Sequence, residues 1–424
     1  SQSFFNNVTA NEIGFQSGRA SAMGQTHFIN SNTSVATLRN PARLSFINKS
    51  GSNKFFGLNI QLDASLTGLV NTERRSIDVQ DFFGDFLTEA DYVSNDNIYS
   101  YNHFGLIGSF NIFSFNATAG LSYGPWSTLD YSYSEEVRGS QSFDDGIIGI
   151  RDPIIGYHIL NHDGSINLRS LGFAIGVSEL LSFGLSHNYI YDGSYNYKFY
   201  AEQLTESSQY LSSVSNQTGH VNFDGDSFLS ISAIFRMLKN SELSIGYEKN
   251  ALIESGEQFE YSLSNTSGLP NYVNYEDISS LEYIQGLTID KPEKIKFGFM
   301  YNQGSSKNGR LFSVELIKNN FLNSQIVKDY LKINMGIEYI SYDTVFRFGL
   351  SYKEPSLQTL SPLTTLCFGT AQQYSNLIFD IGLSYSYQNY HYQDLFPVDG
   401  DVRPDYDNVH ESNWNLVSTV SYQF

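Results

Sequence analysis

The feature that most constrains this chain is a strict alternation of apolar and polar residues. In 55–66, apolar side chains from Phe56 to Leu66 occupy the even positions, and Asp63 and other polar or small residues occupy most odd ones. A period of two with one apolar face is typical of a β-strand between two different environments. About fourteen segments show this pattern, most of them near the length a strand needs to cross a membrane: 55–66, 98–110, 112–125, 166–177, 182–192, 226–237, 242–250, 294–302, 310–317, 330–339, 345–353, 364–370, 376–388 and 413–424.

The connections between these segments alternate between short and long. Short turns lie near Asn111 and in 178–180, 239–241 and 341–343, whereas the long connections are 67–97, 126–165, 193–225, 251–293 and 389–412. Short turns on one side and long loops on the other are typical of an outer-membrane barrel. The pattern therefore predicts an all-β fold, a closed antiparallel barrel of about 14 strands in the outer membrane of a Gram-negative bacterium. The even number of strands places both termini in the periplasm.

Composition agrees with this fold and excludes several classes of protein. Only 16% of residues are charged and 15% are aromatic, which favours strands over helices. The formal charge of -19 argues against a nucleic-acid partner, because phosphate contacts need clustered Lys and Arg. The single Cys367 excludes a disulfide framework and a Cys-based zinc site. A soluble β-sandwich or propeller would also alternate, but its strands would be shorter, about five to six residues.

Residues 1–50 lack a strand pattern long enough to join the wall. They are rich in small residues, and the turn Asn40-Pro41-Ala42 stands shortly before the first strand. A barrel of about fourteen strands has a lumen too wide for its wall side chains to fill. We therefore expect residues 1–50 to form a hatch that plugs the lumen, and residues 51–424 to form the barrel.

Two elements of this N-terminal segment resemble a known family. GlyArgAlaSerAlaMetGly at 18–24, followed by a polar spacer and Asn40-Pro41-Ala42, is similar to the hatch of the FadL family of long-chain fatty-acid transporters. The segment 338–352 resembles a late hairpin of the same family. The resemblance implies that Gly18 and Arg19 belong to the plug and that Asn40, Pro41 and Ala42 form its turn. The same plan also resembles the barrel subunit that shuttles cargo in type IX secretion of Bacteroidota.

The inward positions inferred from the alternation are mostly small or polar, with apolar residues and scattered charges among them. The charges include Asp63, Glu315 and Asp380, which we expect to be satisfied against the plug. A hydrophilic porin would carry ladders of charged residues instead. Six residues are therefore candidates to line the lumen: Phe55, His103, Ile107, Ile234, Met300 and Arg347.

Two hypotheses for the function follow. The first is passive uptake of hydrophobic, fatty-acid-like molecules through the plugged barrel, with a sideways exit into membrane lipid. The second is a barrel subunit that binds another outer-membrane protein or a secreted cargo through its Tyr-rich, acidic loops. In the first hypothesis the lumen holds a ligand, and in the second it stays empty.

Catalysis is not expected. The pattern GlyLeuSerTyrGly at 120–124 lies inside an alternating segment, where no strand-to-helix elbow is expected, and the histidines show no spacing with Ser that marks a nucleophile motif. The acidic run 399–408 lacks the Gly and terminal Glu of an EF-hand, so a solvated loop is expected there, with a loop-stiffening Ca²⁺ as the alternative. We therefore predict no enzyme activity and no cofactor.

Overall fold

A computed structural model describes residues 4–5, 12–47, 58–112, 115–138, 154–204, 216–223, 225–238, 240–255, 262–264, 288–304, 308–324, 326–342, 344–396 and 406–424 of the 424-residue chain. Short helices come first: α2 (Gly18–Ala22), α3 (His27–Asn30), α4 (Ala36–Arg39), η1 (Pro41–Arg43) and α5 (Leu44–Ile47). Strands follow: β1 (Asn59–Gln80), β2 (Phe86–Ile112), β3 (Phe115–Thr128), β4 (Tyr131–Arg138), β5 (Ile154–Gly176), β6 (Leu181–Gln203), β7 (Asn216–Phe223), β8 (Ser227–Leu238), β9 (Ser241–Glu248), β10 (Ala251–Glu254), β11 (Ser262–Ser264), β12 (Thr288–Lys291), β13 (Glu293–Gly304), β14 (Asn308–Asn320), β15 (Tyr330–Ser341), β16 (Thr344–Lys353), β17 (Leu363–Tyr374), β18 (Leu377–Gln393) and β19 (Tyr406–Gln423).

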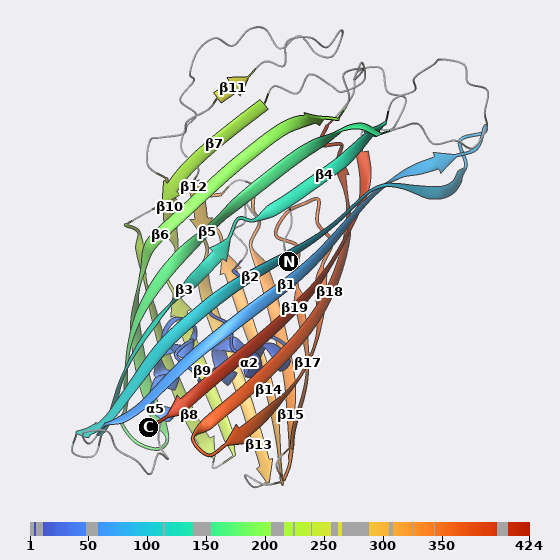
Figure 1. Cartoon of the computed structure of the whole chain (residues 1–424). Coiled ribbons are helices and arrows are strands. Elements are labelled where there is room, and N and C mark those ends of the chain that lie inside the picture. The colour runs from blue at the N-terminus through green and yellow to red at the C-terminus, as the bar shows by residue number, and fades with distance from the viewer. Residues whose placement is uncertain are drawn as a thin grey trace.

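The strands form a closed antiparallel barrel (Figure 1). Most strands pair with their neighbours in sequence, whereas β3 also pairs with β5, β6 with β8, and β9 with β13. Pairing of β1 with β19, from Gln61↔Gln423 to Ser76↔Asn408, closes the sheet. The pairs β3 and β4, β7 and β8, β9 and β10, and β12 and β13 are each two pieces of one position, so the wall has 14 positions. The predicted 14-stranded barrel is confirmed, and each predicted segment falls on one of these positions.

Several strands run further than the alternation predicted, and the longest extensions are at the end that carries the long connections. β1 continues from 66 to Gln80, and β5 begins at Ile154 instead of 166. Above the lipid both faces of such a strand meet polar surroundings, so its outward residues need not be apolar. The alternation of apolar and polar residues therefore ends before the hydrogen-bonded ladder does.

Large apolar side chains cover the outside of the wall. Leu62, Leu66, Phe104 and Leu106 are more than a third exposed, while Asp63 on the opposite face of β1 is buried. A continuous exposed apolar band is unfavourable in water and is typical of a surface that faces lipid. Within the described residues, the structure has no helix long and apolar enough to cross a membrane.

The N-terminal segment (residues 12–47) lies inside the barrel, nearer the end with the short turns (Figure 1). Wall glycines allow it to pack directly against the strands. A side chain at Gly349 would overlap the backbone of Gly24, and one at Gly184 would overlap the backbone of Pro41 and Ala42. The many inward Gly residues of the sequence are therefore the contact surface for this segment.

Charged groups of the wall hold the same segment at several points. The Glu338 carboxylate accepts two hydrogen bonds from Arg19, at 3.0 and 2.8 Å. Asp63 accepts from the backbone and hydroxyl of Ser34, at 2.8 and 2.6 Å. Glu315 accepts from the backbone N–H of Phe28 at 2.9 Å. These buried carboxylates have their partners on the N-terminal segment or close to it, which is why polar wall residues are stable inside the barrel.

Candidate functional site

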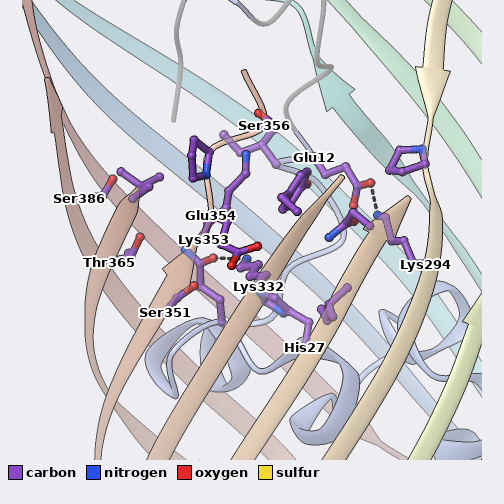
Figure 2. A pocket seen from close by; sticks show the side chains of 18 of the residues that line it. Glu12, His27, Lys294, Lys332, Ser351, Lys353, Glu354, Ser356, Thr365 and Ser386 are labelled. Carbon is purple, nitrogen blue, oxygen red and sulfur yellow. Dashed lines mark hydrogen bonds and ion pairs between the residues drawn. The ribbon is translucent and has the colours of Figure 1, made fainter. Parts of the chain in front are cut away.

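A cavity of about 210 Å³ lies between the N-terminal segment and the wall. Figure 2 shows its side chains above the helices, with residues of β13, β15, β16, β17 and β18 on the wall side. Its lining is mixed. Lys and Glu side chains lie beside a set of apolar residues: Phe5, Ile13, Phe28, Leu69, Trp126, Phe321, Tyr330, Leu360 and Leu363. Such a cavity can hold a molecule with both a charged and an apolar part.

Two lysines of this cavity stand directly opposite each other. Lys332 of β15 and Lys353 of β16 are register partners, and both line the cavity (Figure 2). Lys332 Nζ donates to Gln25 Oε1 at 2.7 Å, and Lys353 Nζ lies 4.8 Å from the ring centroid of Tyr330. Within the described part of the chain, neither ammonium group forms an ion pair with a carboxylate. Like charges opposite each other are unfavourable in a sheet, so this pair would bind an anion.

The other lysines of the cavity already pair with carboxylates. Lys296 Nζ lies 2.6 Å from Glu248 Oε2, and Lys294 contacts both Glu248 and Glu12. Burial alone would raise the pKa of the Glu12 carboxyl, but the charges of Lys294 and Arg39 outweigh it and lower the pKa to about 2. Glu12 is therefore ionised at physiological pH and ties the N-terminal segment to β13.

The second feature of the site is a seam in the wall between β2 and the strand pair β3–β4. The β2–β3 ladder runs only from Phe104↔Tyr123 to Ile112↔Phe115. Beyond Tyr123, β3 pairs with β5 alone, and β4 likewise pairs with β5. Within the described residues, no backbone ladder joins the outer part of β2 to these strands.

The local sequence explains why the ladder ends there. Pro125 has no N–H to donate to a neighbouring strand. The register of β3 against β5 shifts between Pro125 and Ser127, which makes Trp126 a bulge residue. Residues 124–128 are all buried, so β3 bends toward the interior instead of alternating.

Side chains bridge the seam where the ladder is missing. The hydroxyl of Tyr101 lies 2.7 Å from Asp130 Oδ2 and 2.9 Å from Thr128 Oγ1. Further out, Asn97 Nδ2 donates to the carbonyl of Ser132 at 2.8 Å. Single side-chain hydrogen bonds are easier to break than a continuous ladder, so the seam is the weakest line in this part of the wall.

A second cavity, of about 690 Å³, opens at the seam. Its lining comes from both faces of the wall. Tyr131 and His162 are buried on the inner face, whereas Asp163, Lys198 and His220 are exposed on the outer face. The recess therefore lies beside β4, next to the seam.

Residues 12–15 of the N-terminal segment close the seam from inside. Ile13 packs with Leu69 and Tyr101 in one apolar cluster. A side chain at Gly14 would overlap the carbonyl of Pro125, so this backbone lies directly against the bend of β3. Because Ile13 and Leu69 also line the first cavity, the apolar lining is continuous from the cavity to the seam.

The residues that we predicted as hatch residues lie in well-anchored positions. Gly18 N–H donates to Thr419 Oγ1 at 2.9 Å, and Arg19 binds Glu338. Asn40 Nδ2 donates to the Phe28 carbonyl at 2.8 Å, whereas Pro41 and Ala42 pack against Gly184. The structure places all five residues away from the seam.

The predicted lumen residues are spread over the inner face of the wall and do not form one site. His103 is buried and lies 5.0 Å, ring to ring, from Phe15, and Ile107 packs with Ala36 and Leu44. Ile234 is buried and Met300 is half-buried. Arg347 pairs with Glu338 and Asp380. Phe55 lies outside the described residues.

Sequence reasoning missed the two features that define the site. Lys332 and Lys353 are each nine residues from the closing pair of the hairpin, Ser341↔Thr344, so a hairpin register would have placed them together. Gly124-Pro125 inside an alternating run was the available signal for a bend. Among the described residues, no group of three His, Cys, Asp or Glu side chains is arranged to hold a metal ion, and most of the run 399–408 lies outside them.

A closed antiparallel barrel with an apolar outer band defines the class of this chain as an outer-membrane-type β-barrel protein. Comparison with solved structures then identifies its fold as FadL-like. A FadL homologue of Pseudomonas aeruginosa has 13% identity and a TM-score of 0.58, with 98% of each chain covered. The P. putida toluene transporter TodX has 16% identity and a TM-score of 0.53, with 96% of this chain and 98% of that chain covered.

The monoaromatic hydrocarbon channel CymD is a third structure with this fold. Its identity is 12% and its TM-score 0.51, with 99% of both chains covered. No family model matches the sequence, and no curated protein sequence matches it. The similarity therefore resides in the three-dimensional fold.

Proposed function

We propose that this barrel takes up hydrophobic molecules with an anionic head group, such as fatty acids, across the outer membrane of a Gram-negative bacterium. The observation that carries the proposal is the Lys332–Lys353 pair, which faces a partly apolar cavity and has no carboxylate partner among the described residues. A carboxylate head group would accept hydrogen bonds from both ammonium groups and reduce their mutual repulsion, and the apolar residues would contact the tail. The FadL homologue and the hydrocarbon channels with the same fold support the hydrophobic part of this proposal.

The seam is the proposed exit. A ligand in the cavity contacts Ile13 and Leu69, which are packed against Tyr101 at the seam. Displacement of Ile13 and rupture of the Tyr101–Asp130 hydrogen bond would open a lateral path between β2 and β3–β4. The ligand would then enter lipid directly, without crossing the anchored part of the N-terminal segment. Transport of this kind is passive. Burial of the ligand's tail in apolar surroundings stabilises the complex by about 0.8 kcal/mol per methylene group.

The N-terminal segment is the proposed plug, and only one part of it is the proposed gate. Arg19 and Ala42 are held to the wall by Glu338 and Ser232, the latter at 2.9 Å. Residues 13–15 instead lie against the bend of β3. We therefore assign gating to residues 13–15 and sealing to Glu12 and residues 16–47, and we place the C-terminus, at the end with the short turns, on the periplasmic side.

The Lys332→Gln/Lys353→Gln variant tests the proposal. In lipid nanodiscs, its affinity for dodecanoate should fall about tenfold or more, because each charge-assisted hydrogen bond contributes about 1.5–3 kcal/mol. Affinity for dodecanol, which has the same tail and no charge, should stay unchanged. Isothermal titration calorimetry of both ligands with both proteins gives the comparison.

Lys318→Gln is the matched control, because Lys318 is an exposed lysine of β14. It should bind both ligands like the unmodified barrel. Equal loss of dodecanoate and dodecanol in the double variant would show a damaged cavity, and no loss of either would refute the lysine site. An unmodified barrel that binds neither ligand would refute hydrophobic uptake itself.

A further inference from the structure

The hairpin that joins β1 and β2 projects beyond the rest of the wall, at the upper right of Figure 1. Pairing of β1 with β19 ends at Ser76↔Asn408. From Ile77 onward β1 pairs only with β2, as far as Gln80↔Phe86. The end of this hairpin is therefore a two-stranded ribbon that the barrel does not cover.

The tip of the ribbon is apolar and exposed. Phe82 is 97% exposed and Phe83 is 85% exposed, with their rings edge to face at 5.6 Å. Phe86 and Leu87, on the returning strand, are also exposed. Four large apolar side chains clustered at a solvent-exposed tip are unfavourable in water and mark an interaction site.

A well-formed turn holds this tip in place. Asp81 Oδ1 accepts hydrogen bonds from the backbone N–H of Phe83 at 2.8 Å and of Asp85 at 2.9 Å. Gly84 adopts a φ of 86°, which a side chain would disfavour, and donates to the Asp81 carbonyl at 3.0 Å. The backbone under the two phenylalanines is therefore ordered before any partner binds, which reduces the entropy cost of binding.

Charge indicates the kind of partner. Residues 77–90, which form this ribbon and its tip, contain four acidic residues and no Lys or Arg. An anionic lipid surface would repel this ribbon, whereas a basic protein surface would attract it. We propose that the β1–β2 tip docks into a second protein that offers an apolar pocket framed by Lys or Arg. Phe82 and Phe83 would fill the pocket, and the carboxylates would meet its rim.

Photocrosslinking in the native membrane tests this proposal, which does not depend on the uptake function. A photoreactive benzoylphenylalanine replaces Phe83 in the full chain, and the same residue in place of Ile326 serves as control. Ile326 is 70% exposed and lies in the connection between β14 and β15, which leaves the barrel at the same end. The crosslinked peptide is then identified by mass spectrometry.

We expect one protein to crosslink from position 83 and not from position 326, through a peptide that carries Lys or Arg beside apolar residues. Phe82→Ser should reduce this product about tenfold, as loss of an aromatic anchor does. Salt at about 0.5 M should also reduce it, because screening weakens the charge pairing. Crosslinks to lipid alone, no product, or a product that neither salt nor Phe82→Ser reduces would overturn the proposal.

Discussion

The wall is sealed in two different ways at β1–β19 and at β2–β3. The first junction joins the two ends of the barrel through a ladder without a register shift from Gln61↔Gln423 to Ser76↔Asn408. The second has a ladder only up to Phe104↔Tyr123, and side chains bridge the rest. The junction between the first and last strands is thus the continuous one. The junction between β2 and its neighbour in sequence is left open along more than half of β2.

The comparison shows that the missing ladder at the seam does not result from joining the two ends of the barrel. It arises where Pro125 and the Trp126 bulge bend β3 inward, and where Gly14 allows the N-terminal segment to lie against that bend. Each variant below is therefore compared with a control substitution where the wall is sealed by a ladder.

Locking the seam should have the largest effect. Asn97→Cys and Ser132→Cys, made in a Cys367→Ala background, can be joined by a short cleavable thiol crosslinker. If ligand leaves through the seam, uptake of a fluorescent fatty acid into vesicles should fall about a hundredfold and recover on cleavage. The same crosslink between Asn71→Cys and Asn413→Cys, which are register partners in β1 and β19, should leave uptake unchanged. Equal uptake with both locks would refute a lateral exit between β2 and β4.

Moving residues 13–15 away from the bend should have the next largest effect. Gly14→Ala places a methyl group against the Pro125 carbonyl, so the segment must shift and the seam loses its inner cover. We expect leakage of a small hydrophobic dye to rise about tenfold. This corresponds to a loss of roughly 1.4 kcal/mol in the free energy of the closed state relative to the open state. Gly108→Ala in β2 is the control, because no atom lies within 4 Å of the added methyl group. Leakage that stays at the level of Gly108→Ala would argue against a gating role for this segment.

Removing one bridging hydroxyl should have a smaller effect. Tyr101→Phe keeps the ring in its apolar cluster and removes the hydrogen bond to Asp130. Loss of a hydrogen bond to a charged group costs about 1.5–3 kcal/mol, most of it regained when Asp130 is hydrated in the open seam. We therefore expect amide exchange near Ser132 to accelerate several-fold, and Tyr123→Phe to leave it unchanged. Exchange that is equal in both variants would show that Tyr101 does not hold the seam.

Most of the fold could be predicted because the two faces of a membrane strand meet different surroundings, so its residues alternate between apolar and polar. Leu62 and Asp63 alternate as strictly in the structure as in the sequence, and the short turns fix the pairing of neighbours. Contacts between the N-terminal segment and the wall could not be predicted in detail. Glu338 and Arg19 are more than three hundred residues apart, and no local pattern joins them.

The site was harder to predict, because its key property is a missing partner. The positions of Lys332 and Lys353 follow from hairpin geometry, but the lack of a nearby carboxylate depends on where all other chain segments fold. The same holds for the seam. Gly124-Pro125 signals an irregular strand, yet only the three-dimensional arrangement shows that β2 loses its partner there.

The smallest expected effect is that of pH on the ion pairs of Glu12. It tests whether these contacts belong to the anchored part of the N-terminal segment or to the gate. The pKa of Glu12 is lowered to about 2, so its contribution to stability is present above the unfolded pKa near 4.5 and is lost only as pH falls toward 2. Between pH 5 and pH 8 the Glu12 contacts with Lys294 and Arg39 should therefore hold without change. Thermal unfolding of the barrel and of Glu12→Gln should differ by a constant amount over this range. A difference that shrinks markedly at pH 5 would show that Glu12 titrates there and that its ion pairs belong to the moving part of the segment.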